Sequence, residues 1–332
     1  QQTVALGYSS CGRVVEVGAE VSDLRPGDLV ACAGQDYASH AELAAVPRTL
    51  VARVPEGVPA DHAAFATLGA IALEGVRLAR VELGETVVVI GLGLLGQITV
   101  QLLVAAGCRV IGVDLNAARV DLARQSGAVR AITSDEIPAS DPVSVTGTPH
   151  GADAVLITAD SASNDPVELA AALAREKGRV VAVGLVKMDL PRHEFFLKEL
   201  AFVVSRSTGP GRYDPEFEIE GHDYPYPYVR WTQTRNLEAF LDLLARGRLS
   251  LAPLITHRFP FRDAPAAYEL LLGNSAPLGI VLEYAPEQPG MERRLPAAAA
   301  PALASSSLAL ACIGAGSFAR TILLPALAEH GE

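Results

Sequence analysis

The middle of the chain alternates unbroken apolar segments with longer segments in which hydrophobic residues recur at helical spacing. The apolar segments, rich in β-branched residues, lie at 85–90, 108–114, 128–133, 152–158 and 178–184. Helix-like segments such as 94–107 and 116–128 separate them. Strands that are buried on both faces have no polar side to alternate, so this pattern predicts a parallel sheet with helices over both faces. We therefore predict an α/β fold with a doubly wound domain over residues 76–208.

The first 55 residues have a different texture, in which short apolar runs are separated by Gly, Pro and Asp turn signals. These runs lie at 12–18, 24–34, 40–47 and 49–55. The pattern predicts a small β-rich unit, which we assign to residues 1–75.

The chain after the doubly wound domain is predicted to return to the β-rich unit over residues 209–285. Residues 209–228 are rich in Pro, Gly, Tyr and acids, which suits an ordered loop of the kind that often carries function. Beyond it, the spacing predicts a helix, a strand, a second helix and a final strand at 234–247, 254–260, 263–273 and 278–284.

The last part of the chain changes abruptly in composition. Residues 286–307 are rich in Pro, Ala and Ser and have no periodicity, which is typical of a linker. Residues 308–332 then resemble a second strand, glycine loop and helix start, with Gly314, Gly316 and Ala319 in a G-x-G-x-x-A pattern. A domain of this type needs roughly 100 or more further residues. We expect a longer protein that is truncated at both ends here; the alternative is a strand and helix that dock on the first unit.

A glycine pattern, G-x-G-x-x-G, lies between the first predicted strand of the sheet and the helix that follows it. Gly91 permits the sharp turn, Gly93 leaves room for a pyrophosphate, and Gly96 permits close packing of the helix. The helix N-terminus adds amide donors and the positive end of a dipole. The predicted coenzyme-binding loop is Gly91, Leu92, Gly93, Leu94, Leu95 and Gly96.

An acidic residue, Asp114, ends the next predicted strand, eighteen residues after Gly96. A carboxylate there accepts both ribose hydroxyl hydrogens of the adenosine half and repels a 2'-phosphate, so NAD is favoured over NADP. Arg119 leaves the choice between NAD and NADP open, because its guanidinium can stack beside the adenine or pair with a phosphate.

Two further strand ends are expected at the same crevice, because ligands bind at the carboxyl ends of parallel strands. They place Thr158 with Ala159, and Gly184 with Leu185, beside the coenzyme. Each is also compatible with an ordinary strand end.

Composition and charge narrow the range of partners. The chain has 332 residues, a net charge of −11 and no basic patch, so nucleic acid and anionic membranes are not expected partners. It has neither an apolar stretch long enough to span a membrane nor a signal-peptide pattern, and we expect a cytoplasmic protein. The four cysteines are scattered without a CxxC pair, which argues against a disulfide framework or a thiolate zinc knot.

The order of these parts resembles the medium-chain dehydrogenase/reductase superfamily, the relatives of zinc alcohol dehydrogenase. The resemblance implies a GroES-like catalytic domain, only partly present, into which a Rossmann domain is inserted. It also implies dehydrogenase activity with NAD or NADP on a small-molecule substrate, and a homodimer or tetramer. The matching segments are GRVVEVGAEVSDLRPGDLV (12–30), ELAAVP (42–47), VVVIGLGLLG (87–96), VIGVD (110–114) and LITHRFPFRDAPAAYELL (254–271).

Two of the three catalytic zinc ligands of that superfamily have no counterparts here, and the other would lie before Gln1. A catalytic zinc needs three protein ligands. The usual Gly-His-Glu falls on Gly7, Tyr8 and Ser9; Ala66 stands at the position of the third ligand; and the cysteine-rich structural lobe is replaced by a short loop. We therefore expect no metal. Two pairs could substitute for the missing zinc ligands, Cys32 with His40 and Asp61 with His62. A further alternative is that residues upstream of Gln1 help to bind a zinc ion.

Without a metal, another group must stabilise charge on the substrate oxygen. Tyr8 is the first candidate, because it takes the position of the lost ligand and a phenol donates or relays a proton; the alternative is a packed aromatic side chain. Arg206 follows the last strand and is a candidate clamp for an anionic substrate, or else a salt-bridge residue. His222 is a third candidate, in a loop expected near a cleft or at a subunit contact.

The tail and the loop carry a second resemblance. The segment LALACIGAGSFARTILLPAL (308–327) is similar to the start of the glucose-fructose oxidoreductase and inositol dehydrogenase (Gfo/Idh/MocA) family. Together with 205–215 and 223–236, it resembles bacterial two-domain oxidoreductases, which implies a fused second oxidoreductase domain and a sugar or sugar-nucleotide substrate in surface polysaccharide synthesis. The sequence thus predicts a zinc-independent, NAD(H)-dependent oxidoreductase; the alternative is a catalytically silent coenzyme-binding module that serves the second domain.

Overall fold

The computed structural model describes residues 5–273, 277–285 and 324–325. The chain divides into two compact units, Gln1–Tyr284 and Ala285–Glu332. All elements described below belong to the first unit. The predicted linker at 286–307 and the second glycine loop at Gly314, Gly316 and Ala319 lie outside the described residues.

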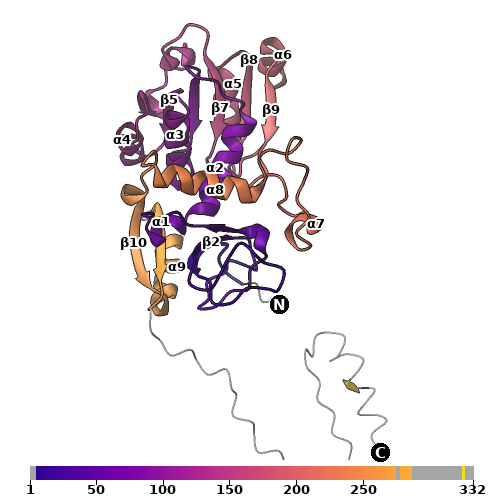
Figure 1. The fold of residues 1–332 in the computed structure, drawn as a ribbon. Helices are drawn as coiled ribbons and strands as arrows, with labels where there is room; N and C mark the ends of the chain where they lie inside the picture. Colours follow the sequence, from indigo (N-terminus) through magenta and orange to yellow (C-terminus); the bar gives the residue numbers. More distant parts are fainter. Residues whose placement is uncertain (1–4, 274–276, 286–323, 326–332) are drawn as a thin grey trace, which may run out of the picture. The chain divides into compact units, whose positions relative to one another are not determined.

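The largest element is a six-stranded, fully parallel sheet (Figure 1). Its strand order is β6-β5-β4-β7-β8-β9, which is the doubly wound order of dinucleotide-binding domains. The predicted α/β Rossmann fold is therefore confirmed, and a sixth strand, β9, is added at one edge. The strands are β4 (Thr86–Ile90), β5 (Arg109–Asp114), β6 (Arg130–Thr133), β7 (Ala152–Ile157), β8 (Ala174–Ala182) and β9 (Ala201–Val204).

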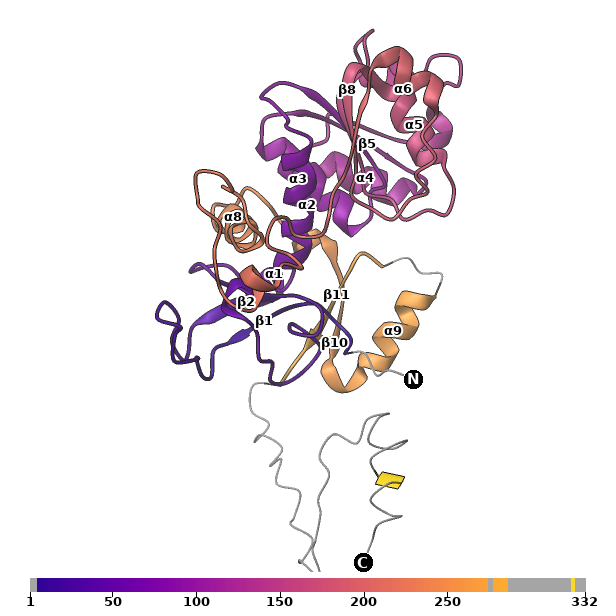
Figure 2. The same ribbon diagram turned by 90° about the vertical axis from the view of Figure 1, so that its right-hand side faces the viewer.

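Helices cover both faces of this sheet because its central strands are apolar on both sides. Val87 and Val89 of β4 belong to one buried cluster, and Val88 and Ile90 of the same strand belong to another. The first cluster includes residues of α3 (Leu94–Ala105) and α4 (Ala117–Gln125), and the second includes residues of α5 (Asp165–Leu173). Figure 2 shows α5 and α6 (Arg192–Lys198) on the opposite side of the sheet from α3.

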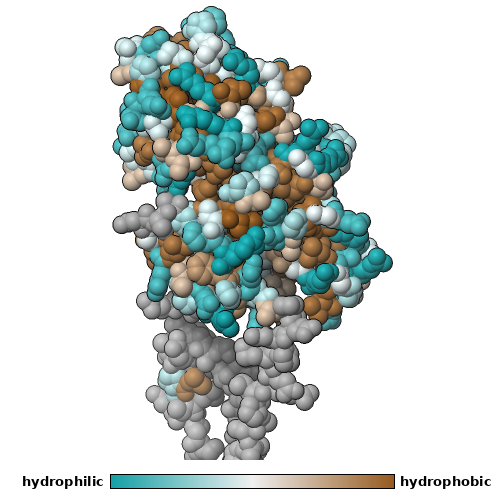
Figure 3. Space-filling view, turned by 90° about the vertical axis from the view of Figure 1, so that its left-hand side faces the viewer, coloured by the Kyte–Doolittle hydropathy of each residue, from teal (hydrophilic) through white to brown (hydrophobic). Residues whose placement is uncertain are grey.

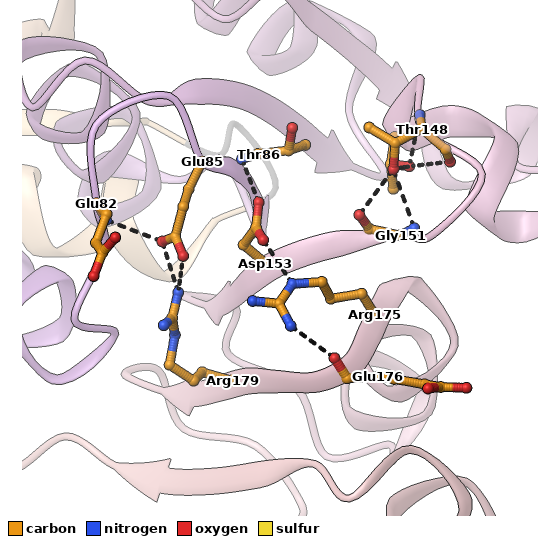
Figure 4. A network of polar contacts seen from close by, with 10 residues as sticks. Glu82, Glu85, Thr86, Thr148, Gly151, Asp153, Arg175, Glu176 and Arg179 are labelled. Carbon is orange, nitrogen blue, oxygen red and sulfur yellow. Dashed lines mark hydrogen bonds and ion pairs between the residues drawn. The ribbon is translucent and has the colours of Figure 1, made fainter.

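Ion pairs tie the amino ends of the strands together. Both carboxylate oxygens of Glu85, just before β4, accept from Arg179 of β8 at 2.6 and 2.7 Å. Asp153 of β7 accepts from Arg175 Nε at 2.6 Å and from the backbone N–H of Thr86 at 2.8 Å (Figure 4). These contacts fix the register at the edge of the sheet opposite to the one where ligands bind.

The β-rich part contains two small sheets. An antiparallel sheet joins β1 (Ser9–Arg13), β2 (Leu29–Ala33) and β3 (Val51–Arg53), and a parallel pair joins β10 (Ile255–Pro260) to β11 (Gly279–Glu283) through α9 (Ala264–Leu272).

Two of the four apolar runs in this region form little or no strand. In 12–18 the ladder ends at Arg13, and only Val14 continues it, with two backbone hydrogen bonds to Gly27 and Asp28. Residues 40–47 form no strand either. Their apolar residues include Leu43, which is exposed, so the alternation there does not mark a buried face.

The helix α2 (Ala66–Leu78) packs against both the nucleotide domain and the β-rich part, so that the two share one hydrophobic core. It packs on α3 of the nucleotide domain and on α8 (Gln233–Ala245), which contacts β3. One buried cluster accordingly runs from Ala31 and Leu50 of the β-rich part to Leu103 of α3. Two short helices, α1 (Ala60–Ala63) and α7 (Pro215–Glu218), complete the α-helices described in this unit.

Among the described residues, no helix is both long and apolar enough to cross a bilayer. Figure 3 shows hydrophilic and hydrophobic residues interspersed over one face of the molecule.

The contact between α2 and α8 gives the first prediction. A Cβ on Gly69 would overlap the fully buried ring of Phe240. We expect Gly69→Ala to lower the free energy of unfolding by about 1–3 kcal/mol, the usual cost of overpacking a core. Denaturant unfolding of the full chain measures this change. Gly12→Ala is the control, because a Cβ there meets nothing within 4 Å; equal stability of the two variants would contradict the packing described here.

Candidate active site

The glycine loop between β4 and α3 leaves no room for a side chain at two positions. Gly91 has a φ of +93°, and a Cβ on it would lie 2.6 Å from the backbone nitrogen of Ala159. A Cβ on Gly96 would overlap the carbonyl oxygen of Gly91. Gly93 is different, because a Cβ there would meet no protein atom within 4 Å. The loop is therefore closed against the protein at its two ends and open at its centre.

The ends of β7 and β8 lie against this loop. The hydroxyl of Thr158 donates to the carbonyl oxygen of Gly91 at 2.5 Å, and the backbone N–H of Thr158 donates to Ile90 at 2.8 Å. A Cβ on Gly184 would overlap the carbonyl oxygen of Ala159. Leu185 follows with a largely exposed side chain. The structure thus brings together the strand ends that the sequence predicts to be adjacent.

Asp114 lies at the end of β5, beside the loop. Its Oδ2 accepts from the backbone N–H of Leu92 at 2.5 Å, and its Oδ1 accepts from that of Asn116 at 2.8 Å. Arg119 Nη1 lies 4.0 Å from Oδ2. The Asp114 side chain is only 8% exposed, yet each of its oxygens retains acceptor capacity for a ligand.

Gln97 was not predicted from the sequence as a site residue, yet its side chain is hydrogen-bonded to the glycine loop. Its buried Nε2 donates to the carbonyl oxygen of Leu92 at 3.1 Å and to that of Arg119 at 2.8 Å. The amide therefore links the glycine loop to the start of α4. Its position directly after the third glycine is the only signal in the sequence.

A cleft of about 190 Å³ contains Tyr8, the first catalytic candidate. The side chain of Tyr8 is about half exposed, and burial of the phenol raises its pKa above the ordinary value of 10. The hydroxyl of Thr67 donates to the backbone oxygen of Tyr8 at 3.3 Å, which ties the start of β1 to α2. The lining residues are Tyr8, Ala33, Gly34, Gln35, Thr67, Ile71, Ser207, Thr208, Arg212 and Tyr213.

The structure does not bring the other two catalytic candidates into this cleft. Arg206 lines a neighbouring cavity. His222 lines neither cavity: its side chain is 71% exposed and lies 3.7 Å from Glu220. Two residues further along the loop, the Tyr224 hydroxyl donates to Asp214 and the Tyr224 ring stacks on Phe217. The structure thus gives no support to a position of His222 at these two cavities, and its position at a subunit contact stays a prediction.

The donor set of the cleft does not fit a zinc ion. Zinc requires thiolate, imidazole or carboxylate ligands, whereas the described lining offers hydroxyls, an amide and the cation of Arg212. Of the substitute ligands, Asp61 is paired with Arg258 at 2.5 Å, and burial raises the pKa of Cys32 to about 11. Over the described ranges, no group of three or more His, Cys, Asp or Glu is placed to hold a metal.

Arg212 and Tyr213 are cleft residues that sequence reasoning did not single out. The guanidinium of Arg212 lies 4.0 Å from the ring centre of Tyr213 and pairs with Glu218 at 2.5 Å. Both residues come from the Gly- and Tyr-rich loop. The sequence predicts an ordered loop there, but its composition does not indicate which of its side chains face the cleft.

The known proteins that are similar to this chain are dehydrogenases. A model of the zinc-binding dehydrogenase family matches residues 95–219. D-guloside 3-dehydrogenase of Escherichia coli K12 is 30% identical over 269 residues, which cover 79% of this chain and 72% of that protein. Galactitol 1-phosphate 5-dehydrogenase of the same organism is 27% identical over 311 residues, 84% of each chain.

Solved structures agree with this result. The crystal structure of galactitol-1-phosphate dehydrogenase from Escherichia coli superposes with a TM-score of 0.68 at 26% identity, and 83% of each chain is covered. Alcohol dehydrogenase TADH from Thermus sp. ATN1 shares the fold, with a TM-score of 0.69 at 23% identity and 84% of each chain covered.

The chain therefore belongs to the zinc-binding dehydrogenase family. It is an NAD(P)-dependent oxidoreductase of the medium-chain class, as the first resemblance in the sequence predicts. The comparisons give no support to the fused second oxidoreductase domain, and truncation, oligomeric state and cytoplasmic location stay predictions.

The two glycines of the loop give the second prediction. We expect Gly96→Ala to destabilise the chain by about 1–3 kcal/mol, because the new Cβ overlaps backbone and forces the helix away from the strand. Gly93→Ala is the matched control and should unfold like the wild type, since its Cβ enters open space. Thermal unfolding of the full chain compares the two; a Gly93→Ala variant as unstable as Gly96→Ala would argue against this loop geometry.

Proposed function

We propose that this chain is an NAD-dependent dehydrogenase that acts on a secondary alcohol or carbonyl carbon of a sugar or polyol without a zinc ion. The observation that carries the proposal is the glycine loop, closed at Gly91 and Gly96 and open at Gly93, with Asp114 hydrogen-bonded to it. These residues would hold the coenzyme, and the bound coenzyme would supply or accept the hydride.

The preference for NAD follows from charge. Asp114 is mostly buried and already adjoins the loop, so a 2'-phosphate beside it would meet a carboxylate in a poorly solvated place. Arg119 lies 4.0 Å from the same carboxylate. It is therefore occupied in part by Asp114 and is a weak partner for a phosphate.

Tyr8 is proposed to replace the zinc ion as the group that stabilises the substrate oxygen. Because burial raises the pKa of its phenol, the hydroxyl stays protonated at neutral pH. A protonated phenol donates a hydrogen bond to a carbonyl oxygen and gives up its proton as that oxygen becomes a hydroxyl. The proton is then replaced from solvent, because the side chain is half exposed.

The substrate class is supported by the relatives. D-guloside 3-dehydrogenase and galactitol 1-phosphate 5-dehydrogenase carry sugar and polyol substrates in their names. The cleft agrees with such a substrate, because Gln35, Thr67 and Ser207 offer polar groups that hydrogen-bond to hydroxyls. A role in surface polysaccharide metabolism remains a prediction of the sequence resemblance.

The third prediction concerns coenzyme choice. Asp114→Asn removes the negative charge, so we expect NAD affinity to fall about tenfold or more while NADP affinity changes little or rises. Titration with NADH and NADPH, followed by nucleotide fluorescence, measures both. Asp121→Asn, on an exposed face of α4, is the control. An unchanged ratio of the two affinities would contradict the assigned role of Asp114.

The fourth prediction concerns the metal and Tyr8. The purified protein should contain well under one zinc per chain and keep its activity after dialysis against a chelator. Turnover is assayed as coenzyme reduction with methyl D-guloside, galactitol 1-phosphate and sorbitol. Tyr8→Phe should lower kcat by about 100-fold, the usual size of a proton-transfer contribution, with coenzyme affinity unchanged.

The matched control is Tyr37→Phe, which removes a phenolic hydroxyl outside the cleft. One firmly held zinc per chain, or full activity in Tyr8→Phe, would refute the zinc-independent mechanism. Tight coenzyme binding without turnover of any sugar or polyol would instead favour the catalytically silent module.

A further inference from the structure

A second cavity of about 380 Å³ adjoins the cleft that holds Tyr8. The two share Arg212 and Tyr213 as a common wall. The cleft alone, at about 190 Å³, is smaller than the roughly 300–1,000 Å³ of typical small-molecule sites. The second cavity is lined by Glu74, Leu78, Val204, Arg206, Gly209, Pro210, Gly211, Arg212, Tyr213, Asp214 and Tyr224.

The walls of this cavity are held in place by buried contacts. Gly209 has a φ of +104°, and a Cβ on it would lie 2.6 Å from Glu74 Oε2. The buried Asn236 of α8 donates to that same oxygen at 3.3 Å and to the backbone oxygen of Thr208 at 2.9 Å. Gly211 is packed on Phe217 in the same way. The cavity is thus formed in advance, which lowers the cost of ordering a ligand.

Hydrogen-bond donors in this cavity come from two arginines stacked on one ring. Arg206 lies 4.6 Å and Arg212 lies 4.0 Å from the centre of the Tyr213 ring. Arg212 is paired with Glu218, whereas Arg206 has no carboxylate partner among the residues described. Tyr213 is held with a φ of +66°, an uncommon conformation for a residue with a side chain. Such strain is often found where a side chain has a function.

Acceptors are present as well, in the form of two carboxylates. The Glu74 side chain is buried, and over the described part of the chain no hydrogen bond reaches its second oxygen, Oε1. Asp214 accepts from the Tyr224 hydroxyl. Leu78, Val204 and Pro210 add apolar surface. A ligand here must therefore both donate and accept hydrogen bonds, and it must also present an apolar face.

A sugar ring meets all of these requirements, because its hydroxyls donate to carboxylates and accept from guanidinium groups while its C–H faces pack on apolar side chains. A phosphate meets them less well, since it would lie in one cavity with Glu74 and Asp214. We propose that the second cavity binds the second sugar ring of a glycoside whose first ring is oxidised in the Tyr8 cleft. This inference rests on the proposed function and extends it from a single sugar or polyol unit to a glycoside with two sugar rings.

The experiment compares four forms of each hexose in the gluco, galacto and gulo series. The forms are the free hexose, its methyl glycoside, its 1-phosphate, and a disaccharide with that hexose at the non-reducing end. Coenzyme reduction by the full chain gives kcat/KM for each. In the series that is turned over, we expect the disaccharide to exceed the methyl glycoside by about tenfold, the ratio that one good contact supplies.

Two variants test the cavity from different sides. Val204→Trp fills it from an exposed position on β9, and Arg206→Ala removes its unpaired donor. Each should bring the ratio of disaccharide to methyl glycoside close to one. Tyr228→Ala, in the same loop but 88% exposed and outside both cavities, is the control and should keep the ratio.

The possible failures are distinguishable. Turnover of hexoses without a disaccharide preference, or a preference that survives both variants, would overturn the second-ring site and leave the proposed function intact. A preference for the 1-phosphate that disappears in Arg206→Ala would also overturn it, in favour of an anion site. Coenzyme binding without turnover of any sugar would overturn the proposed function and the glycoside site together.

Discussion

The close approach of Gly91 and Gly96 is the constraint on which the rest of the site depends. A Cβ at either position would enter backbone atoms, and the hydroxyl of Thr158 closes the remaining space by donating to the Gly91 carbonyl oxygen. The first turn of α3 is thereby fixed against the ends of β4 and β7. Since the N–H groups of a first helical turn lack partners within the helix, this packing leaves donors available beside the open position at Gly93.

The position of the cleft that contains Tyr8 follows from the helix shared by the two parts of the fold. Because α2 packs on both α3 and α8, one hydrophobic core runs through the nucleotide domain and the β-rich part. Thr67 and Ile71 of this helix face the same cleft as Tyr8, while Glu74 and Leu78, further along it, line the second cavity. A single helix therefore sets the distance between the two cavities, and α8 fixes their common loop through Asn236.

The sequence predicted well those strands whose residue types indicate that both faces are buried. The unbroken apolar runs at 85–90 and 152–158 predict β4 and β7 because strands buried on both faces need no polar side. The runs at 12–18 and 40–47 suggested strands that are largely absent, because apolar residues in these runs are exposed and the runs make few ladder hydrogen bonds. Local patterns do not reveal whether a neighbouring strand is present.

The candidate site likewise contains residues that the sequence predicts and residues that it does not. The glycine loop and Asp114 are predictable because their spacing reflects one βαβ unit. The orientation of Arg212, Tyr213 and His222 depends on contacts within their loop and with α8, such as those of Arg212 with Glu218 and of the Gln233 N–H with the Pro210 carbonyl oxygen. Contacts of this kind leave no periodic pattern in the sequence. Tyr8 was found only through the missing metal ligand, and its presence in a cleft supports, without testing, the role proposed for it.

The most direct test of the account is a fluorescence titration of the full-length chain with NADH, combined with amide hydrogen exchange. The single tryptophan, Trp231, provides an energy-transfer donor. We expect saturable binding of one NADH per chain, with new protection at residues 91–97 and around Asp114. Absence of binding by a folded protein, or protection elsewhere with these residues unchanged, would contradict it.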